Sequence, residues 1–312
     1  MRGTHFRPSL RSLLPAMASL LMAATPDAGT FDVSIAAGAA FAHADFRLWL
    51  PPKLARVRAV VVLVPGSNQD GRSLVEDLSW RAFATRNGAA LLGCYFADRP
   101  HELDFIEQYS DASKGSGAAL MQALQQLSAA AKQPSLAGTP LLLWGFSAGG
   151  QFNFEFAAWQ PERVAAFVVN KGGVYFSALT SAATRAVPAM LFVGERDLPM
   201  RTTVVEGLFA LNRRAAALWS LVHEPGVSHE LGQSRELGML FLEDSLALRL
   251  KPSSSAMRAA SAAEGFRGDP LSRRVAPAAS AANADYPSVW LPSERVAKAW
   301  LAVISGNLIS VP

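Results

Sequence analysis

The sequence has very little of what cross-linked or metal-binding proteins need. Cys94 is the only cysteine in 312 residues, which excludes an intramolecular disulfide and a cysteine-based metal cluster. The sequence has only five histidines, which argues against a histidine-rich metal site. Charged residues make up only 17% of the chain against 50% apolar residues, so intrinsic disorder is excluded. Because Cys94 stands in the apolar stretch 89–96, we expect it to be a buried small side chain.

A basic surface for nucleic acid is also missing. The formal net charge is +4, but the excess lies at the two ends of the chain. Residues 1–28 carry three arginines against one aspartate, and residues 251–312 carry seven basic against four acidic side chains. Residues 29–250 are therefore slightly acidic, which argues against nucleic acid as a partner.

The N-terminal segment resembles an export signal. Arg2, Arg7 and Arg11 precede the apolar stretch 13–24, which is too short to span a bilayer as a helix. The pattern predicts a signal peptide over residues 1–28 and a secreted or periplasmic mature protein without an integral membrane span. A disordered tail or an N-terminal anchor is the alternative.

The body of the chain alternates short apolar runs with helical patterns, which predicts a mostly parallel sheet with helices on both faces. The expected strands are 31–35, 46–50, 59–64, 89–96, 140–144, 164–169, 189–193 and 218–222. The expected helices are 74–87, 117–131, 148–159, 202–217 and 231–250. In such sheets ligands bind beyond the carboxyl ends of the strands, so the loops after the strands are where chemistry is expected.

The C-terminal part differs in composition from the body. Residues 251–287 are rich in Ala, Ser, Arg and Pro, and predict an excursion with little regular structure. A packing pattern returns over residues 288–312. Ser293 can cap a helix that runs to Ile304, and we expect this helix to dock on the main domain.

A Gly-x-Ser-x-Gly motif joins one expected strand to the next helix. Gly145, Ser147 and Gly149 stand between the strand 140–144 and the helix 148–159. Such a context forces the serine into a tight turn, exposes its hydroxyl, and aims the helix N-terminus at it. Side chains at positions 145 and 149 would collide with neighbouring backbone. The motif therefore predicts a nucleophilic Ser147, and the alternative is a glycine-rich turn with an idle serine.

A serine nucleophile needs a base, and the base needs an acid to orient it. His229 follows the expected strand 218–222 in a loop, whereas the alternative, His223, still belongs to the strand end. Asp197 lies in the loop after the strand 189–193, and Glu195 is its competitor. We predict Ser147, His229 and Asp197 as the catalytic residues.

The tetrahedral intermediate needs two hydrogen-bond donors, which form an oxyanion hole. One is the backbone N–H of Ala148, directly after the serine. The loop that follows the strand 59–64 supplies the other, and Gly66 would allow close approach. We predict the N–H of Ser67 as this second donor, with Asn68 as the alternative. An ordinary polar turn is the competing interpretation.

The order Ser147, Asp197, His229 at successive strand ends resembles the α/β-hydrolases over about residues 46–250. The resemblance implies a catalytic domain over 29–250 with an eight-stranded sheet and little or no cap domain. It also implies hydrolysis of small or polymeric esters without a cofactor or metal. Within that superfamily the chain is most similar to extracellular esterases and polyester (polyhydroxyalkanoate) depolymerases. It departs from many of them in having Pro65 before Gly66 where they have histidine.

Two rival functions remain open at this point. A serine peptidase of the same fold would use the same three residues, and a catalytically idle protein of this fold would bind without turnover. The loop 98–111 after the strand 89–96 is expected to be solvated, with a pocket wall as the alternative. The segment 170–175 should border the pocket, which we expect to be open unless residues 98–116 or 251–287 cover it.

Overall fold

The structure is a computed structural model that describes residues 29–54, 56–103, 106–251, 256–280 and 286–310. The predicted signal peptide over 1–28 lies outside the described residues. Within the described residues no helix combines the length and the apolar character that crossing a membrane requires.

Eight strands form the central sheet in the order β1-β2-β4-β3-β5-β6-β7-β8. They are β1 (Thr30–Ile35), β2 (His43–Trp49), β3 (Ala59–Val64), β4 (Ala89–Ala97), β5 (Leu141–Phe146), β6 (Val164–Asn170), β7 (Ala189–Gly194) and β8 (Trp219–Glu224). β2 runs antiparallel to β1 and β4, and all other pairs are parallel. The predicted eight-stranded, mostly parallel sheet is confirmed.

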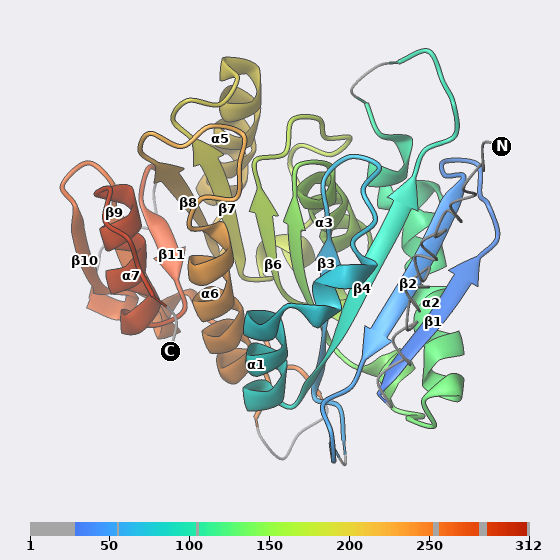
Figure 1. The fold of residues 1–312 in the computed structure, drawn as a ribbon. Coiled ribbons are helices and arrows are strands. Elements are labelled where there is room, and N and C mark those ends of the chain that lie inside the picture. The colour runs from blue at the N-terminus through green and yellow to red at the C-terminus, as the bar shows by residue number, and fades with distance from the viewer. Residues whose placement is uncertain (1–28, 55, 104–105, 252–255, 281–285, 311–312) are drawn as a thin grey trace, which may run out of the picture.

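Helices cover both faces of this sheet. They are α1 (Leu78–Asn87), α2 (Ser116–Ala130), α3 (Ala148–Trp159), the short α4 (Ala182–Arg185), α5 (Pro199–Arg214), α6 (Ser234–Arg249) and α7 (Glu294–Ile304). Figure 1 shows α1 and α6 in front of the sheet and α2 and α3 behind it. The sequence pattern places 74–87 in one helix, but a 3-10 turn precedes α1, because the Asp77 side chain caps α1 through the N–H of Trp80.

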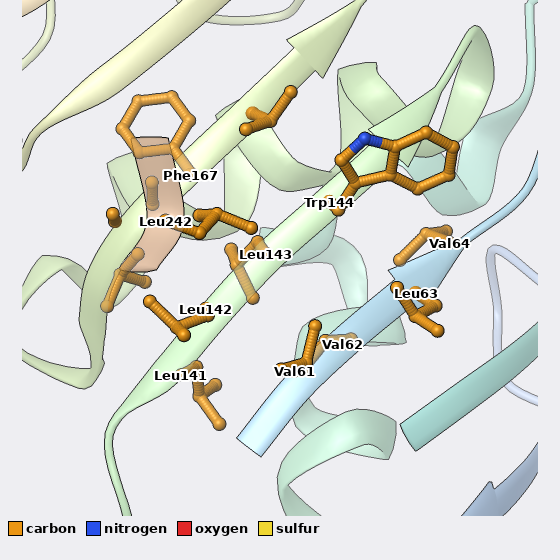
Figure 2. Packing of buried hydrophobic residues seen from close by; sticks show 14 of the residues in the cluster. Val61, Val62, Leu63, Val64, Leu141, Leu142, Leu143, Trp144, Phe167 and Leu242 are labelled. Atoms are coloured by element: carbon orange, nitrogen blue, oxygen red, sulfur yellow. The ribbon is translucent and has the colours of Figure 1, made fainter. Parts of the chain in front are cut away.

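The central strands are almost entirely apolar, as expected for strands that are covered on both faces. Every residue of β3, β6 and β7 is buried, and Figure 2 shows the side chains of β3 and β5 packed among their neighbours. Cys94 on β4 is fully buried. Burial of this core fixes the sheet, and thereby the positions of the loops at its carboxyl edge.

A second, three-stranded antiparallel sheet lies beyond the β8 edge of the first (Figure 1). It contains β9 (Phe266–Asp269), β10 (Arg274–Pro277) and β11 (Val289–Leu291). The prediction of little regular structure over 251–287 is therefore wrong for residues 266–277. Apolar side chains are few there because β9 and β10 are short and Gly268 is their only buried residue. The Trp300 ring of α7 lies against this glycine.

The C-terminal helix packs on the main domain. α7 contacts α6 and β8, and the indole N–H of Trp300 donates a hydrogen bond of 2.8 Å to the carbonyl of Leu221. Ser293 caps this helix by accepting the N–H of Val296. A buried tryptophan with a satisfied N–H anchors the end of the chain to the last strand of the large sheet.

Candidate active site

Ser147 occupies a sharp turn between β5 and α3. Its backbone has φ 53° and ψ −120°, a combination that residues other than glycine rarely adopt. The Ser147 N–H donates a hydrogen bond of 2.7 Å to the carbonyl of Asn170 at the end of β6. Such a conformation costs about 1–3 kcal/mol and persists only where neighbouring structure holds it.

The two glycines of the motif are required by packing. A Cβ atom at Gly145 would collide with the backbone carbonyl of Gly149. A Cβ atom at Gly149 would collide with the carbonyl of Val64, the last residue of β3. The turn can therefore approach β3 only when both positions lack side chains.

His229 lies between Ser147 and Asp197. It is carried by the loop between β8 and α6, and its Nε2 atom lies 3.0 Å from Oγ of Ser147. Its Nδ1 atom lies 2.7 Å from Oδ2 of Asp197. With the proton on Nδ1, the imidazole donates to the carboxylate, and its Nε2 accepts the Ser147 hydroxyl proton.

The Asp197 carboxylate is shielded from water but well supplied with donors. Its side chain is 2% exposed. Oδ1 accepts the backbone N–H of Leu198 at 2.7 Å and a guanidinium N–H of Arg201 at 3.2 Å. Burial opposes ionisation, yet the hydrogen bonds from His229, Leu198 and Arg201 outweigh it and hold the pKa of Asp197 below its usual range. The group is therefore an anion at neutral pH.

The competing histidine and acid lie elsewhere. The His223 side chain is 48% exposed and faces Glu206, with 3.5 Å between His223 Nε2 and Glu206 Oε1. Glu195 stands in an exposed turn, where it accepts the N–H of Gly226 at 2.6 Å. The structure brings neither residue to Ser147.

Two backbone N–H groups are available near the serine. Ala148 is the first residue of α3, where helical N–H groups have no partner within the helix. In the loop after β3, the N–H of Asn68 donates to the Tyr109 hydroxyl at 3.3 Å, whereas the N–H of Ser67 has no acceptor among the described residues. This difference favours Ser67 over Asn68. A side chain at Gly66 would meet only ordinary contacts with the surrounding protein.

The serine and histidine open into a cleft of about 1110 Å³. Three exposed apolar side chains that line it are called the apolar rim here: Leu103, Leu198 and Met200, which are 57%, 53% and 60% exposed. Gly173 and Val174 also line the cleft, in agreement with the expectation for the segment after β6. The described residues contain no group of three or more His, Cys, Asp and Glu that could hold a metal ion.

The loop after β4 forms a wall of this cleft, which is the alternative to the solvated loop expected from the sequence. Residues 98–101, 103, 106 and 107 line the cleft. Asp98 organises the loop, since its carboxylate accepts the N–H groups of Gln108 and Tyr109 at 3.0 Å. The N–H of Asp98 donates to the side-chain oxygen of Asn68 at 2.8 Å, which ties this wall to the Ser67 loop. None of the described residues within 251–287 lines the cleft.

Three residues near the site were not singled out from the sequence for these roles. Arg201 binds Asp197, and its position four residues later at the start of α5 is the signal that could have found it. The Phe146 ring lies 5.0 Å from the His229 ring. The side-chain oxygen of Gln151 accepts the N–H groups of Gly173 and Val174, which fixes that wall of the cleft.

No family model and no curated protein matches this chain. Poly(aspartic acid) hydrolase-1 from Sphingomonas sp. KT-1 is similar in structure, with a TM-score of 0.50 and 15% identity over 69% of this chain and 98% of that one. A ferulic acid esterase has a TM-score of 0.51 and 9% identity over 70% of this chain and 98% of its own. At such identities the likeness concerns the fold.

The chain has the α/β-hydrolase fold. In this chain only 18 residues separate β6 from β7, and they contain just the one-turn helix α4. The structure therefore has little room for a cap domain, as predicted, and the cleft is walled instead by the loop after β4.

Proposed function

We propose that the protein is a serine hydrolase that cleaves carboxylic esters, with Ser147 as nucleophile, His229 as general base and acid, and Asp197 as the residue that orients His229. The observation that supports this most directly is the hydrogen-bonded chain from Asp197 through His229 to Ser147, with Ser147 and His229 lining an open cleft. Of the two fold neighbours described above, one is named a hydrolase and the other an esterase, which agrees with the proposal.

The reaction proceeds in two halves. Oγ of Ser147 bonds to the ester carbonyl carbon while its proton passes to Nε2 of His229. The tetrahedral adduct then breaks its bond to the alcohol oxygen, which leaves with the proton from His229. Water attacks the acyl-enzyme, gives a proton to His229, and the acid departs as that proton returns to Ser147. The N–H groups of Ala148 and Ser67 stabilise the negative oxygen in both halves.

The apolar rim indicates where the substrate's carbon skeleton rests. Exposed apolar side chains beside a catalytic group bind apolar parts of a ligand by excluding water. A cleft of about 1110 Å³, with only 18 residues between β6 and β7 to cover it, leaves room for long or branched esters, including segments of a polyester. We therefore propose esters with an extended apolar acyl or alcohol part, small or polymeric, as substrates.

A panel of substrates tests the proposal. p-Nitrophenyl esters of increasing acyl length and a polyester film should be hydrolysed, and peptidyl anilides should not. Turnover should disappear in Ser147→Ala and in His229→Ala, while far-UV circular dichroism stays that of the wild type. Faster cleavage of anilides than of esters would make the protein a peptidase. No turnover of any substrate would make it an idle binding protein.

We also propose that the protein is exported. The basic start followed by the apolar stretch 13–24 is the observation that motivates this. Intact-mass measurement of the protein recovered from a secreting host should show the loss of about 24–30 N-terminal residues, in line with the usual signal length. A full-length product confined to the cytosol would contradict export.

A further inference from the structure

A fully buried ion pair lies beneath the active site. Lys171 directly follows β6, Glu224 ends β8, and the side chains are 0% and 1% exposed. Nζ of Lys171 donates a hydrogen bond to Oε2 of Glu224. Burying two charged groups away from water costs free energy, unless the geometry of the pair is good and the remaining hydrogen-bonding atoms of both groups have partners. The remaining hydrogen bonds of Lys171 and Glu224 show which parts of the site this ion pair connects.

Lys171 is connected to the nucleophile turn. Its Nζ also donates to the side-chain oxygen of Asn170 at 3.0 Å. Asn170 accepts the Ser147 N–H through its backbone carbonyl at 2.7 Å, and its amide donates to Oγ of Ser234 at 2.6 Å. Lys171 itself has φ 57°, an uncommon conformation that turns the chain at the end of β6. The ammonium group therefore supports the residue that holds Ser147 in its strained conformation.

Glu224 is connected to the loop that carries His229. Its second oxygen, Oε1, accepts the backbone N–H of Gln233 at 2.6 Å. The carboxylate thus joins the two ends of the segment 224–233, which contains His229. A side chain at Gly232 would collide with this carboxylate, so the glycine allows the loop to close over it.

The loop that carries Asp197 meets the same cluster. A Cβ atom at Gly194, the last residue of β7, would lie 2.6 Å from the carbonyl of Val227 and 3.1 Å from Cε of Lys171. The N–H of Arg196 donates to the carbonyl of Val227 at 2.8 Å. The ends of β6, β7 and β8 therefore converge around one buried lysine.

We propose that Lys171 and Glu224 are positioning residues, which hold the His229 loop at the correct distance from Ser147 by joining Asn170 to the segment 224–233. The proposal rests on the proposed serine hydrolase function. Neither residue lines the cleft, so the pair acts through His229 and Ser147 and not through contact with substrate.

A double variant tests whether the Lys171–Glu224 pair positions the catalytic residues or only stabilises the core. Lys171→Met/Glu224→Gln removes both charges, leaves no unpaired buried ion, and keeps an acceptor for the Gln233 N–H, so the melting temperature should stay close to that of the wild type. A misplacement of catalytic groups by about 1 Å can reduce rates about 100-fold. We expect kcat on a p-nitrophenyl ester, and the rate of fluorophosphonate inactivation, to fall by about 10-fold to 100-fold. KM should change little.

Arg249 offers a matched control, because it is a buried cation at the opposite end of β6. It binds the carbonyls of Val164 and Ala165 at 2.7 Å and 2.9 Å. Arg249→Met should lower the melting temperature but leave kcat per folded molecule unchanged. An equal loss of kcat in this variant would mean that any buried cation matters, and would overturn the positioning role.

The remaining outcomes are also decisive. A folded double variant with wild-type kcat would show that the pair supports only the core. Should the double variant fail to fold, Asn170→Ala provides the second test, since it removes the amide between Lys171 and Ser234 without changing a charge. It should lower kcat with KM unchanged, and wild-type kcat would overturn the proposal. Failure of the wild type to hydrolyse esters or react with fluorophosphonate would be a failure of the proposed function instead.

Discussion

Asp197 and His229 share a hydrogen bond of 2.7 Å between Oδ2 and Nδ1, and they lie 32 residues apart in the sequence. The acid comes from the loop after β7 and the imidazole from the loop after β8. Neighbouring parallel strands bring their carboxyl ends to the same edge of the sheet. Two short loops therefore suffice to bring Asp197 and His229 into contact. The carboxylate selects the tautomer with Nδ1–H, which leaves Nε2 facing Ser147.

Asp197→Asn should preserve the fold and lose activity. An amide NH₂ facing Nδ1 favours the wrong tautomer, with the proton on Nε2, and such a change lowers kcat by about 10⁴ in a serine protease. Steady-state kinetics on a p-nitrophenyl ester measure the loss. Glu195→Gln is the matched control, because Glu195 binds only the exposed turn at Gly226. A larger loss in Glu195→Gln than in Asp197→Asn would show that the wrong acid has been assigned.

Acid should destabilise the protein in part through Asp197. The pKa of Asp197 is lowered in the folded protein from its ordinary 3.8, so the folded state binds this proton less readily than the unfolded state. Its contribution to stability is complete above pH 3.8 and is lost as the pH falls through the lower, folded-state pKa. Urea unfolding at several pH values should show a shallower acid dependence in Asp197→Asn than in the wild type. Identical slopes would contradict the contribution.

Replacing Ser147, the proposed nucleophile, should reveal the strain of its turn. At φ 53° and ψ −120°, glycine relieves a strain of about 1–3 kcal/mol but loses up to about 1 kcal/mol through its freer unfolded chain. Ser147→Gly should therefore be more stable than Ser147→Ala by about 1 kcal/mol, and both should be inactive. Denaturant unfolding of the two variants measures the difference. Equal stability, or a more stable alanine variant, would mean that the turn holds no strain.

The backbone N–H of Ser67 can be removed without changing the proposed catalytic residues Ser147, His229 and Asp197. Ser67→Pro eliminates this donor, whereas Ser67→Ala removes only the hydroxyl and keeps the N–H. We expect kcat to fall about 10²-fold to 10³-fold in Ser67→Pro and to change little in Ser67→Ala. Circular dichroism of both variants checks that the loop change leaves the fold intact. A large loss in Ser67→Ala would point to the hydroxyl, and none in Ser67→Pro would remove Ser67 from the oxyanion hole.

The sheet was predictable because burial on both faces leaves a simple pattern. β3, β6 and β7 consist of apolar runs bounded by turn residues, so strand positions and fold class follow from sequence. The predicted nucleophile, base and acid could be named because each lies in the turn or loop that follows a largely apolar strand. Their hydrogen bonds could not be predicted, since they depend on loop conformations.

Contacts between loops that are far apart in the chain leave no recognisable pattern in the sequence around either residue. Lys171 and Glu224 are 53 residues apart, and each is followed by residues typical of ordinary turns. Asp98 resembles a solvated residue in an acidic loop, yet its carboxylate closes that loop by accepting backbone N–H groups. The strands β9 and β10 were missed because each has only four residues and is mostly unburied, so neither leaves an apolar run in the sequence.

The central claim is that Ser147 is a nucleophile activated by His229, and covalent labelling tests it most directly. A fluorophosphonate probe followed by peptide mapping should place one adduct per molecule on Ser147. Labelling should be abolished in Ser147→Ala and slowed by orders of magnitude in His229→Ala. An unlabelled wild type, or an adduct that persists in Ser147→Ala, would contradict the account.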